Sequence, residues 1–190
     1  MSGIVKNGTY EVYDKNGILR KRFKYKNNLL DGPYEECDEN GTLRKRCNYK
    51  NNLLDGLYEE YDEKGNLRVR CFYKEGKRNG KYVRYHSNHR VEREFTFKDD
   101  KIDGEYRRYR RDKSLWIKCS FKGGKKDGVK ECYDEKGNLK KRSWYIQGKR
   151  VKRKKYEAYK LNERKVIAQF NRTVQIYREQ AAYDNRINKR

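Results

Sequence analysis

The chain repeats itself every 24 residues. Six copies fit between Asn7 and Arg150 without an insertion or deletion, and each opens with Asn-Gly or Asp-Gly. A register kept over so many copies indicates one supersecondary unit stacked on copies of itself, so that neighbours cover one another's apolar faces. The repeat therefore predicts an elongated array. We number the copies 1 to 6: residues 7–30, 31–54, 55–78, 79–102, 103–126 and 127–150.

Each copy has the pattern of a β-hairpin. Asn-Gly and Asp-Gly tolerate positive φ, so a tight turn is expected at the opening pair. In copy 3 two aromatics follow, Tyr58 and Tyr61, and then a second turn at residues 63–66. The returning run alternates between two sides, and four residues share one of them: Leu67, Val69, Cys71 and Tyr73. This period of two is typical of a half-buried strand.

Two inward places keep their chemistry in every copy. The aliphatic place holds Leu19, Leu43, Leu67, Val91, Leu115 and Leu139. The aromatic place holds Tyr25, Tyr49, Tyr73, Phe97, Phe121 and Tyr145. Stacked hairpins turn such places into ladders along one face. The predicted fold is all-β, an elongated single-layer antiparallel meander spanning roughly 58 Å at about 4.8 Å per strand, with a C-terminal α-helix. Residues 1–6 are expected to be a strand or tail.

After Arg150 the repeat loses its register. Tyr156 and Tyr159 keep the spacing of the paired aromatics, so residues 151–161 are expected to form a degenerate half-repeat strand. Residues 162–190 predict a basic amphipathic helix with Asn162 as N-cap. Its apolar stripe is Ile167, Phe170, Val174, Tyr177 and Ala181. We expect the stripe to cap the last hairpin; the alternatives are docking of a partner protein and lying at a membrane interface.

The copies resemble the MORN repeat in its longer variant, dGxYxxYdxnGxlxxxxxYxxgkx, with the Gly, Tyr and turn places agreeing over residues 7–150. Lys130 departs from the first Tyr place, and His89 and Lys113 depart from the turn Gly, where an altered turn or bulge is expected. The resemblance implies stacked hairpins used for protein–protein contact, for assembly or for association with acidic lipid surfaces. Similar repeats occur in bacterial antitoxin-like proteins and in giant DNA viruses of the marseillevirus type.

Positive charge gathers toward the C-terminus. Residues 7–78 carry 16 Lys/Arg and 13 Asp/Glu, a net of +3, whereas residues 103–190 carry 28 and 11, a net of +17. In copies 1–3 we expect opposite charges to face each other across the ladder. Two basic clusters are candidates for binding an anionic partner: Arg107, Arg108, Arg110 and Arg111, and Lys152, Arg153, Lys154 and Lys155. The partner would be an acidic protein surface, with nucleic acid or anionic lipid as alternatives.

No catalytic, metal or cofactor site is indicated, and no small-molecule substrate is expected. Cys47, Cys71 and Cys119 share an inward place held elsewhere by Phe, which indicates packing. His86 and His89 are the only histidines, and glycine-rich phosphate loops and nucleophile-elbow motifs are absent. The scattered cysteines favour a reducing compartment, the cytoplasm or a virion, and the N-terminus lacks an export signal.

These observations predict a non-catalytic scaffold in a larger assembly, of which a minor capsid protein is one concrete form. The alternatives are an antitoxin-like inhibitor with a dedicated protein partner and a basic module that binds nucleic acid or anionic lipid.

Overall fold

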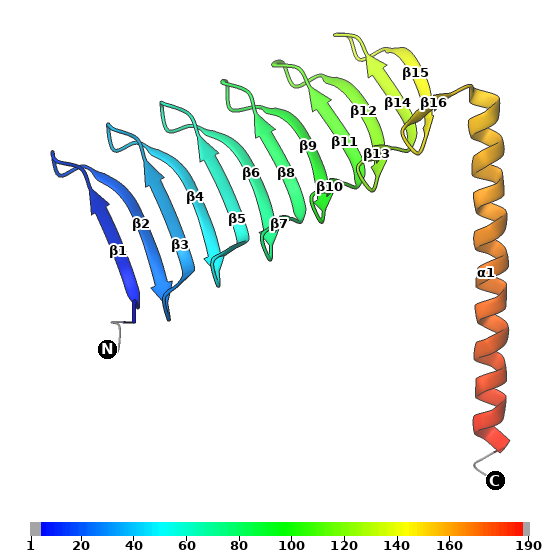
Figure 1. The fold of residues 1–190 in the computed structure, drawn as a ribbon. Coiled ribbons are helices and arrows are strands. Elements are labelled where there is room, and N and C mark those ends of the chain that lie inside the picture. Colours follow the sequence, from blue (N-terminus) through cyan, green and yellow to red (C-terminus); the bar gives the residue numbers. More distant parts are fainter. Residues whose placement is uncertain (1–4, 188–190) are drawn as a thin grey trace.

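The computed structural model describes residues 5–187. They form one open antiparallel sheet that is followed by a single helix (Figure 1). The strands lie in chain order across the sheet, and the short strands β7, β10 and β13 each pair with the strand before them. The single-layer meander predicted from the repeat is confirmed.

The sheet is built from sixteen strands. Their bounds are β1 Gly8–Tyr13, β2 Leu19–Lys26, β3 Leu29–Cys37, β4 Leu43–Lys50, β5 Leu53–Tyr61, β6 Leu67–Lys74, β7 Lys77–Arg78, β8 Gly80–Tyr85, β9 Val91–Lys98, β10 Lys101–Ile102, β11 Gly104–Tyr109, β12 Leu115–Lys122, β13 Lys125–Lys126, β14 Gly128–Tyr133, β15 Leu139–Ile146 and β16 Lys149–Val151.

The turn within each hairpin is organised by an aspartate in copies 1, 2, 3 and 6. In copy 1 the Oδ1 of Asp14 accepts hydrogen bonds from the backbone N–H of Asn16 (2.8 Å) and Ile18 (3.0 Å). Gly17 supplies the positive φ, +78°. Local side-chain acceptors of this kind stabilise turns. A bulge lies beside this turn in every copy; in copy 1 Val12 pairs with Lys21 and Tyr13 with Leu19, so Arg20 is the extra residue.

The turn between copies lies in a different place from the predicted one. Two consecutive residues with positive φ form it, such as Asn27 (φ 51°) and Asn28 (φ 66°), which is the requirement of a two-residue hairpin turn. The Asn-Gly and Asp-Gly pairs instead bend the strand that follows. Gly32 has φ +120°, and a Cβ there would lie 3.1 Å from Cδ of Lys24. The prediction failed because Asn also reaches the left-handed region, so Gly is needed at the bend rather than in the turn.

In copies 1, 3 and 5 the aspartate or asparagine of the opening pair supports the next inter-copy turn. Oδ1 of Asn7 accepts the N–H of Asn27 at 2.8 Å, and Oδ2 of Asp55 accepts the N–H of Glu75 at 3.1 Å. The recurring pair therefore has two roles, a bend made by the glycine and a hydrogen bond made by the residue before it.

One side of the sheet, which we call the aromatic face, carries the rings and most of the buried sulfur. Tyr82 stacks on Phe95 with ring centroids 4.6 Å apart, and Phe95 stacks on Tyr106 at 5.4 Å. Cys47, Cys71 and Cys119 are buried between such rings. The face is defined by Tyr10, Phe23, Tyr25, Tyr34, Cys47, Tyr49, Tyr58, Cys71, Tyr73, Tyr82, Phe95, Phe97, Tyr106, Cys119 and Phe121. Rings stacked across strands are the main apolar contacts of a structure with one layer.

The opposite side, the charged face, is held by ion pairs across strands. Glu59 is only 4% exposed, and it pairs with Arg70 at 2.7 Å and accepts a hydrogen bond from the Tyr61 hydroxyl at 2.7 Å. Arg22 bridges Glu11 (2.7 Å) and Glu35 (3.4 Å) in the same way. The predicted pairing of opposite charges in copies 1–3 is confirmed.

The helix α1 spans Arg153–Ile187 and begins before the predicted N-cap, Asn162. The predicted half-repeat strand is therefore wrong, and the last strand is β16. Residues 152–161 contain no glycine or asparagine to turn the chain back, and residues 153–161 are mostly good helix formers. The three-residue spacing of Tyr156 and Tyr159, read as a strand signal, also places two residues on one side of a helix.

Within residues 5–187, no helix is both long and apolar enough to cross a membrane.

Candidate functional site

The turns of copies 4 and 5 depart most from the repeat, and their substitutions join neighbouring copies. His86 and Arg110 occupy the place of the turn aspartate. A ring nitrogen of His86 lies 3.2 Å from the carbonyl oxygen of Tyr109. Arg110 donates to the carbonyl oxygens of Tyr133 (2.6 Å) and Asp134 (3.0 Å) in copy 6. Each replacement therefore loses the carboxylate that accepts the backbone N–H groups of the turn, and its side chain contacts the turn of the next copy instead.

The backbone of these turns is unchanged, so the predicted altered turn is wrong. His89 and Lys113 adopt φ of 62° and 81° at the place of the glycine. The N–H of His89 still donates to the carbonyl oxygen of His86 at 3.1 Å. Side chains of this size are uncommon at positive φ, so the contacts between copies hold a mildly strained conformation.

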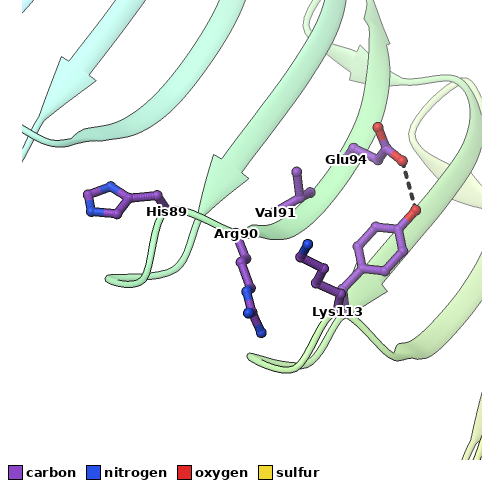
Figure 2. Close-up of a pocket in the computed structure, with 6 residues that line it drawn as sticks. His89, Arg90, Val91, Glu94 and Lys113 are labelled. Atoms are coloured by element: carbon purple, nitrogen blue, oxygen red, sulfur yellow. Dashed lines mark hydrogen bonds between the residues drawn. The ribbon is translucent and has the colours of Figure 1, made fainter.

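A shallow hollow of about 500 Å³ lies between these two turns (Figure 2). Its lining is His89, Arg90, Val91, Glu94, Tyr109 and Lys113. Glu94 is its only carboxylate, and it accepts hydrogen bonds from Tyr109 (2.8 Å) and pairs with Lys81 (2.9 Å). Burial by itself raises the pKa of Glu94, but the bonds from Lys81 and Tyr109 outweigh it and hold the pKa below its usual range. An ionised, fully engaged carboxylate does not serve as a proton donor.

The first predicted basic cluster is divided by the sheet. Arg107 lies on the charged face and pairs with Glu105 and Glu94. Arg108 lies on the aromatic face, with its guanidinium 4.7 Å from the Trp116 ring. Successive strand residues point to opposite faces, so adjacent arginines in the sequence cannot form one patch here.

Arg110 and Arg111 also have different roles. Arg110 is half-buried and committed to the carbonyl oxygens of copy 6, so it is not available to a partner. Arg111 is exposed, and its backbone carbonyl oxygen accepts hydrogen bonds from Asn88 (3.0 Å) and Arg90 (3.1 Å). Of the four predicted residues, Arg111 alone has a side chain with neither an ion pair nor a hydrogen bond within the described residues.

Two further arginines join Arg108 and were missed by the sequence reasoning. Arg84 on β8 stands opposite Arg93 on β9, and Arg93 stands opposite Arg108 on β11. Directly opposite residues share a face, so the three form what we call the arginine row. A signal was present, since copy 3 has Glu60 and Val69 at the places of Arg84 and Arg93. Comparing copies place by place across strands would have found it.

The second predicted cluster lies at the end of the sheet. Lys152, Lys154 and Lys155 are exposed and form no ion pair within residues 5–187, while Arg153 pairs with Glu157 at 2.7 Å. Strands β12, β14, β15 and β16 separate this cluster from β11. The structure thus keeps the two predicted clusters apart.

The helix touches the sheet only near its start. Glu163 lies 3.9 Å from Lys122, and the Tyr156 hydroxyl approaches Gly128. Beyond this contact the helix projects away from the sheet (Figure 1). In the predicted stripe, Phe170 is 66% exposed and Tyr177 72%; Ile167 and Ala181 are also exposed and Val174 is half-buried. The stripe does not cap the last hairpin, because the helix diverges from the sheet before the stripe begins.

Sequence comparison matches the family described as the MORN repeat variant to residues 6–27, 30–51 and 54–75. Copies 1–3 of this chain are therefore MORN repeats. Copies 4–6 lie outside the matched segments, but the sheet continues through them with the same turns and bulges. MORN repeats are in general modules that bind proteins or membrane surfaces, and they are typically non-catalytic.

A comparison with curated proteins gave no match. Among solved structures the chain is similar to one described as "Crystal structure of GtfA/B complex bound to UDP and GlcNAc". The sequence identity is 18% and the TM-score 0.25, with 57% of this chain and 21% of that chain covered. The chain thus spans about a fifth of that chain's length, and a TM-score this low carries no conclusion about function.

The buried thiols of the sheet are protected rather than activated. Burial raises the pKa of the Cys47 and Cys71 thiols to about 11, and it raises that of Cys119 as well. A protonated thiol is a poor nucleophile. Within the described part of the chain, no three His, Cys, Asp or Glu side chains gather closely enough to hold a metal ion.

Proposed function

We propose that this protein is a non-catalytic scaffold whose basic end binds an acidic protein within a larger assembly. Copies 1–3 act as a charge-balanced spacer, and copies 4–6 with α1 carry the binding surfaces. A sheet of one layer has little interior and two extended faces, which suits contact with large partners.

The observation that carries the proposal is uncompensated positive charge at one end. Residues 103–190 have a net charge of +17. The side chains of Arg111, Lys152, Lys154 and Lys155 are exposed without an ion pair in the described chain. Such a field attracts an anionic surface and raises the rate of association with it.

The test compares two quadruple variants of the full chain with equal loss of charge. The basic-end variant replaces Arg111, Lys152, Lys154 and Lys155 with Gln; the control replaces Lys15, Lys26, Lys50 and Lys74, which are exposed in copies 1–3. Binding to long polyglutamate is measured as a function of salt. The proposal expects a weaker complex and a smaller salt dependence for the basic-end variant alone. Equal losses in both variants, or no binding by the unmodified chain, would contradict it.

Duplex DNA and phosphatidylserine vesicles serve as competing probes in the same assay. If the chain binds DNA or the vesicles more tightly than polyglutamate, its partner is a phosphate-bearing molecule and not an acidic protein. A scaffold in a shell, such as a minor capsid protein, predicts many copies per assembly, whereas an antitoxin-like inhibitor predicts a one-to-one complex. Mass measurement of the native complex separates these forms.

A further inference from the structure

The arginine row is a concentration of like charge that the sheet does not neutralise. Glu92 is the acidic residue that reaches it, at 3.2 Å from Arg84 and 3.6 Å from Arg108. Arg93, between them, takes part in none of the ion pairs formed within residues 5–187. Two of the three guanidinium groups therefore share one carboxylate, and the third has none.

The hydrogen-bonding capacity of the row is also unfilled. The Nε atoms of Arg93 and Arg108 are buried, and neither has an acceptor within reach in the described chain. Buried N–H groups without acceptors are rare in folded proteins. The Arg108 side chain remains 38% exposed and that of Arg84 41% exposed, so their guanidinium groups can be approached from solvent.

The row is held in position before any partner arrives. The Trp116 ring centroid lies 4.7 Å from the Arg108 guanidinium, and Glu92 forms ion pairs with both Arg84 and Arg108. A planar, oriented guanidinium binds a carboxylate through two parallel hydrogen bonds. Preorganisation of this kind reduces the entropy lost on binding.

The matching places in copies 2 and 3 indicate what the row accepts. There Lys45 stands opposite both Glu36 and Glu60, and it lies 3.8 Å from Glu36. The sheet itself thus supplies two carboxylates beside one cation at this register. In copies 4 and 5 both glutamate places hold arginine, so the missing carboxylates have to come from outside.

The neighbouring rings argue against stacked nucleic-acid bases. Tyr82, Phe95 and Tyr106 stack on one another beside the row. Binding of single strands relies on aromatic faces that are open to bases, and these faces are covered.

We propose that Arg84, Arg93 and Arg108 form a binding site for an acidic peptide segment, which lies across β8, β9 and β11 and places two or more carboxylates on the row. The outer arginines are two strand spacings apart, about 10 Å. Alternate residues of an extended peptide lie about 6.7 Å apart on one side, a spacing that long arginine side chains can follow. The site rests on the proposed function and assigns it a specific contact.

The test measures binding of labelled hexaglutamate to the full chain and to three variants. Arg93→Gln removes the central charge. Arg93→Lys keeps the charge but cannot form the two parallel hydrogen bonds of a guanidinium group. Arg107→Gln is the matched control on the opposite face of β11. We expect a loss of about tenfold or more for Arg93→Gln, an intermediate loss for Arg93→Lys, and less than about threefold for Arg107→Gln. Circular dichroism and thermal melting confirm that each variant folds.

Equal losses for Arg93→Gln and Arg107→Gln would overturn the site while leaving a diffuse basic field, and hence the proposed function, intact. If the unmodified chain binds neither hexaglutamate nor long polyglutamate, both the site and the proposed function are overturned. Hexathymidylate and phosphatidylserine vesicles are run in parallel. If Arg93→Gln weakens one of these but not hexaglutamate, the row binds phosphate and the peptide assignment is wrong.

Discussion

Copies 1–3 and copies 4–5 build the same sheet with opposite distributions of charge. In copy 3 Glu59 on the outgoing strand pairs with Arg70 on the returning strand. Between copies 4 and 5 the signs are exchanged, because Arg107 on the outgoing strand of copy 5 faces Glu94 on the returning strand of copy 4. Within copy 5 Arg107 faces Lys118, and Glu105 pairs with both. The charged face is thus neutralised in both regions.

The two regions differ on the aromatic face. Copies 2 and 3 place glutamate beside lysine there, whereas copies 4 and 5 place arginine beside arginine. The comparison teaches that net charge does not locate a binding surface. The informative quantity is whether each cation has a carboxylate across the strand.

The largest effect is expected where the repeat geometry leaves no room. Gly80 has φ +116°, and a Cβ there would lie 3.1 Å from Cβ of Phe72; at Gly8, with φ +97°, nothing lies within 4 Å. Gly80→Ala should cost about 2–3 kcal/mol and Gly8→Ala about 1 kcal/mol in the free energy of unfolding. Urea denaturation measures both. Equal costs would show that backbone strain alone matters and that the close strand approach does not.

A comparison of Arg110 with Arg111 distinguishes a basic residue that holds the fold together from one that is available to a partner. Arg110→Ala should lower stability by about 2 kcal/mol because the carbonyl oxygens of Tyr133 and Asp134 lose a charged donor. Arg111→Ala should change it by less than about 0.5 kcal/mol. Thermal denaturation compares the two. Similar values would mean that Arg110 does not join copies 5 and 6.

Acid should weaken the ion-paired region through Glu59. Burial raises its pKa, but hydrogen bonds from Tyr61 and Arg70 outweigh this, so its pKa in the folded chain lies below the usual value. Because its pKa is lower in the folded chain, ionised Glu59 stabilises the fold, and this stabilisation is complete above the unfolded pKa of about 4.3. The stabilisation is lost as the pH falls through the pKa of the folded chain. Glu59→Gln should cost about 1–2 kcal/mol at pH 7 and much less near pH 3. A cost independent of pH, in urea denaturation at both values, would refute the ionic role.

Salt should act in opposite directions on the two regions. Raising sodium chloride from about 0.05 to 0.5 M screens attraction between Arg22 and Glu11 but relieves repulsion within the arginine row. Amide hydrogen exchange should show strands of copies 1–3 weakened and β8, β9 and β11 strengthened, each by about 0.5 kcal/mol. A change of the same sign in both regions would indicate that the row is already neutralised.

The smallest effect is expected on the free part of α1. Phe170→Ser should alter the melting temperature little because the ring is 66% exposed. Tyr156→Ser, at the contact with the sheet, should lower it measurably. A large effect of Phe170→Ser would show that this side chain is covered in solution.

The sequence by itself determined the repeat length, the antiparallel meander, the inward aromatic places and the charge balance of copies 1–3. These follow from local periodicity, because a period of two and a fixed spacing of turn residues specify strands wherever they lie. Local signals were insufficient where two structures use the same residues. Tyr156 and Tyr159 fit a strand end or a helix, and Asn27-Asn28 makes the turn that Asp31-Gly32 was expected to make.

Only the tertiary structure decided which distant side chains meet. Arg84, Arg93 and Arg108 become neighbours because cross-strand register places them opposite one another, while Arg107 and Arg108, adjacent in the chain, point to opposite faces. The same register allows Arg110 to reach the carbonyl oxygen of Tyr133 in copy 6. The helix α1 follows the last strand and projects away from the sheet, so its apolar stripe has no strand to cover (Figure 1). Periodicity describes one strand at a time, whereas the environment of a charge depends on the strands beside it.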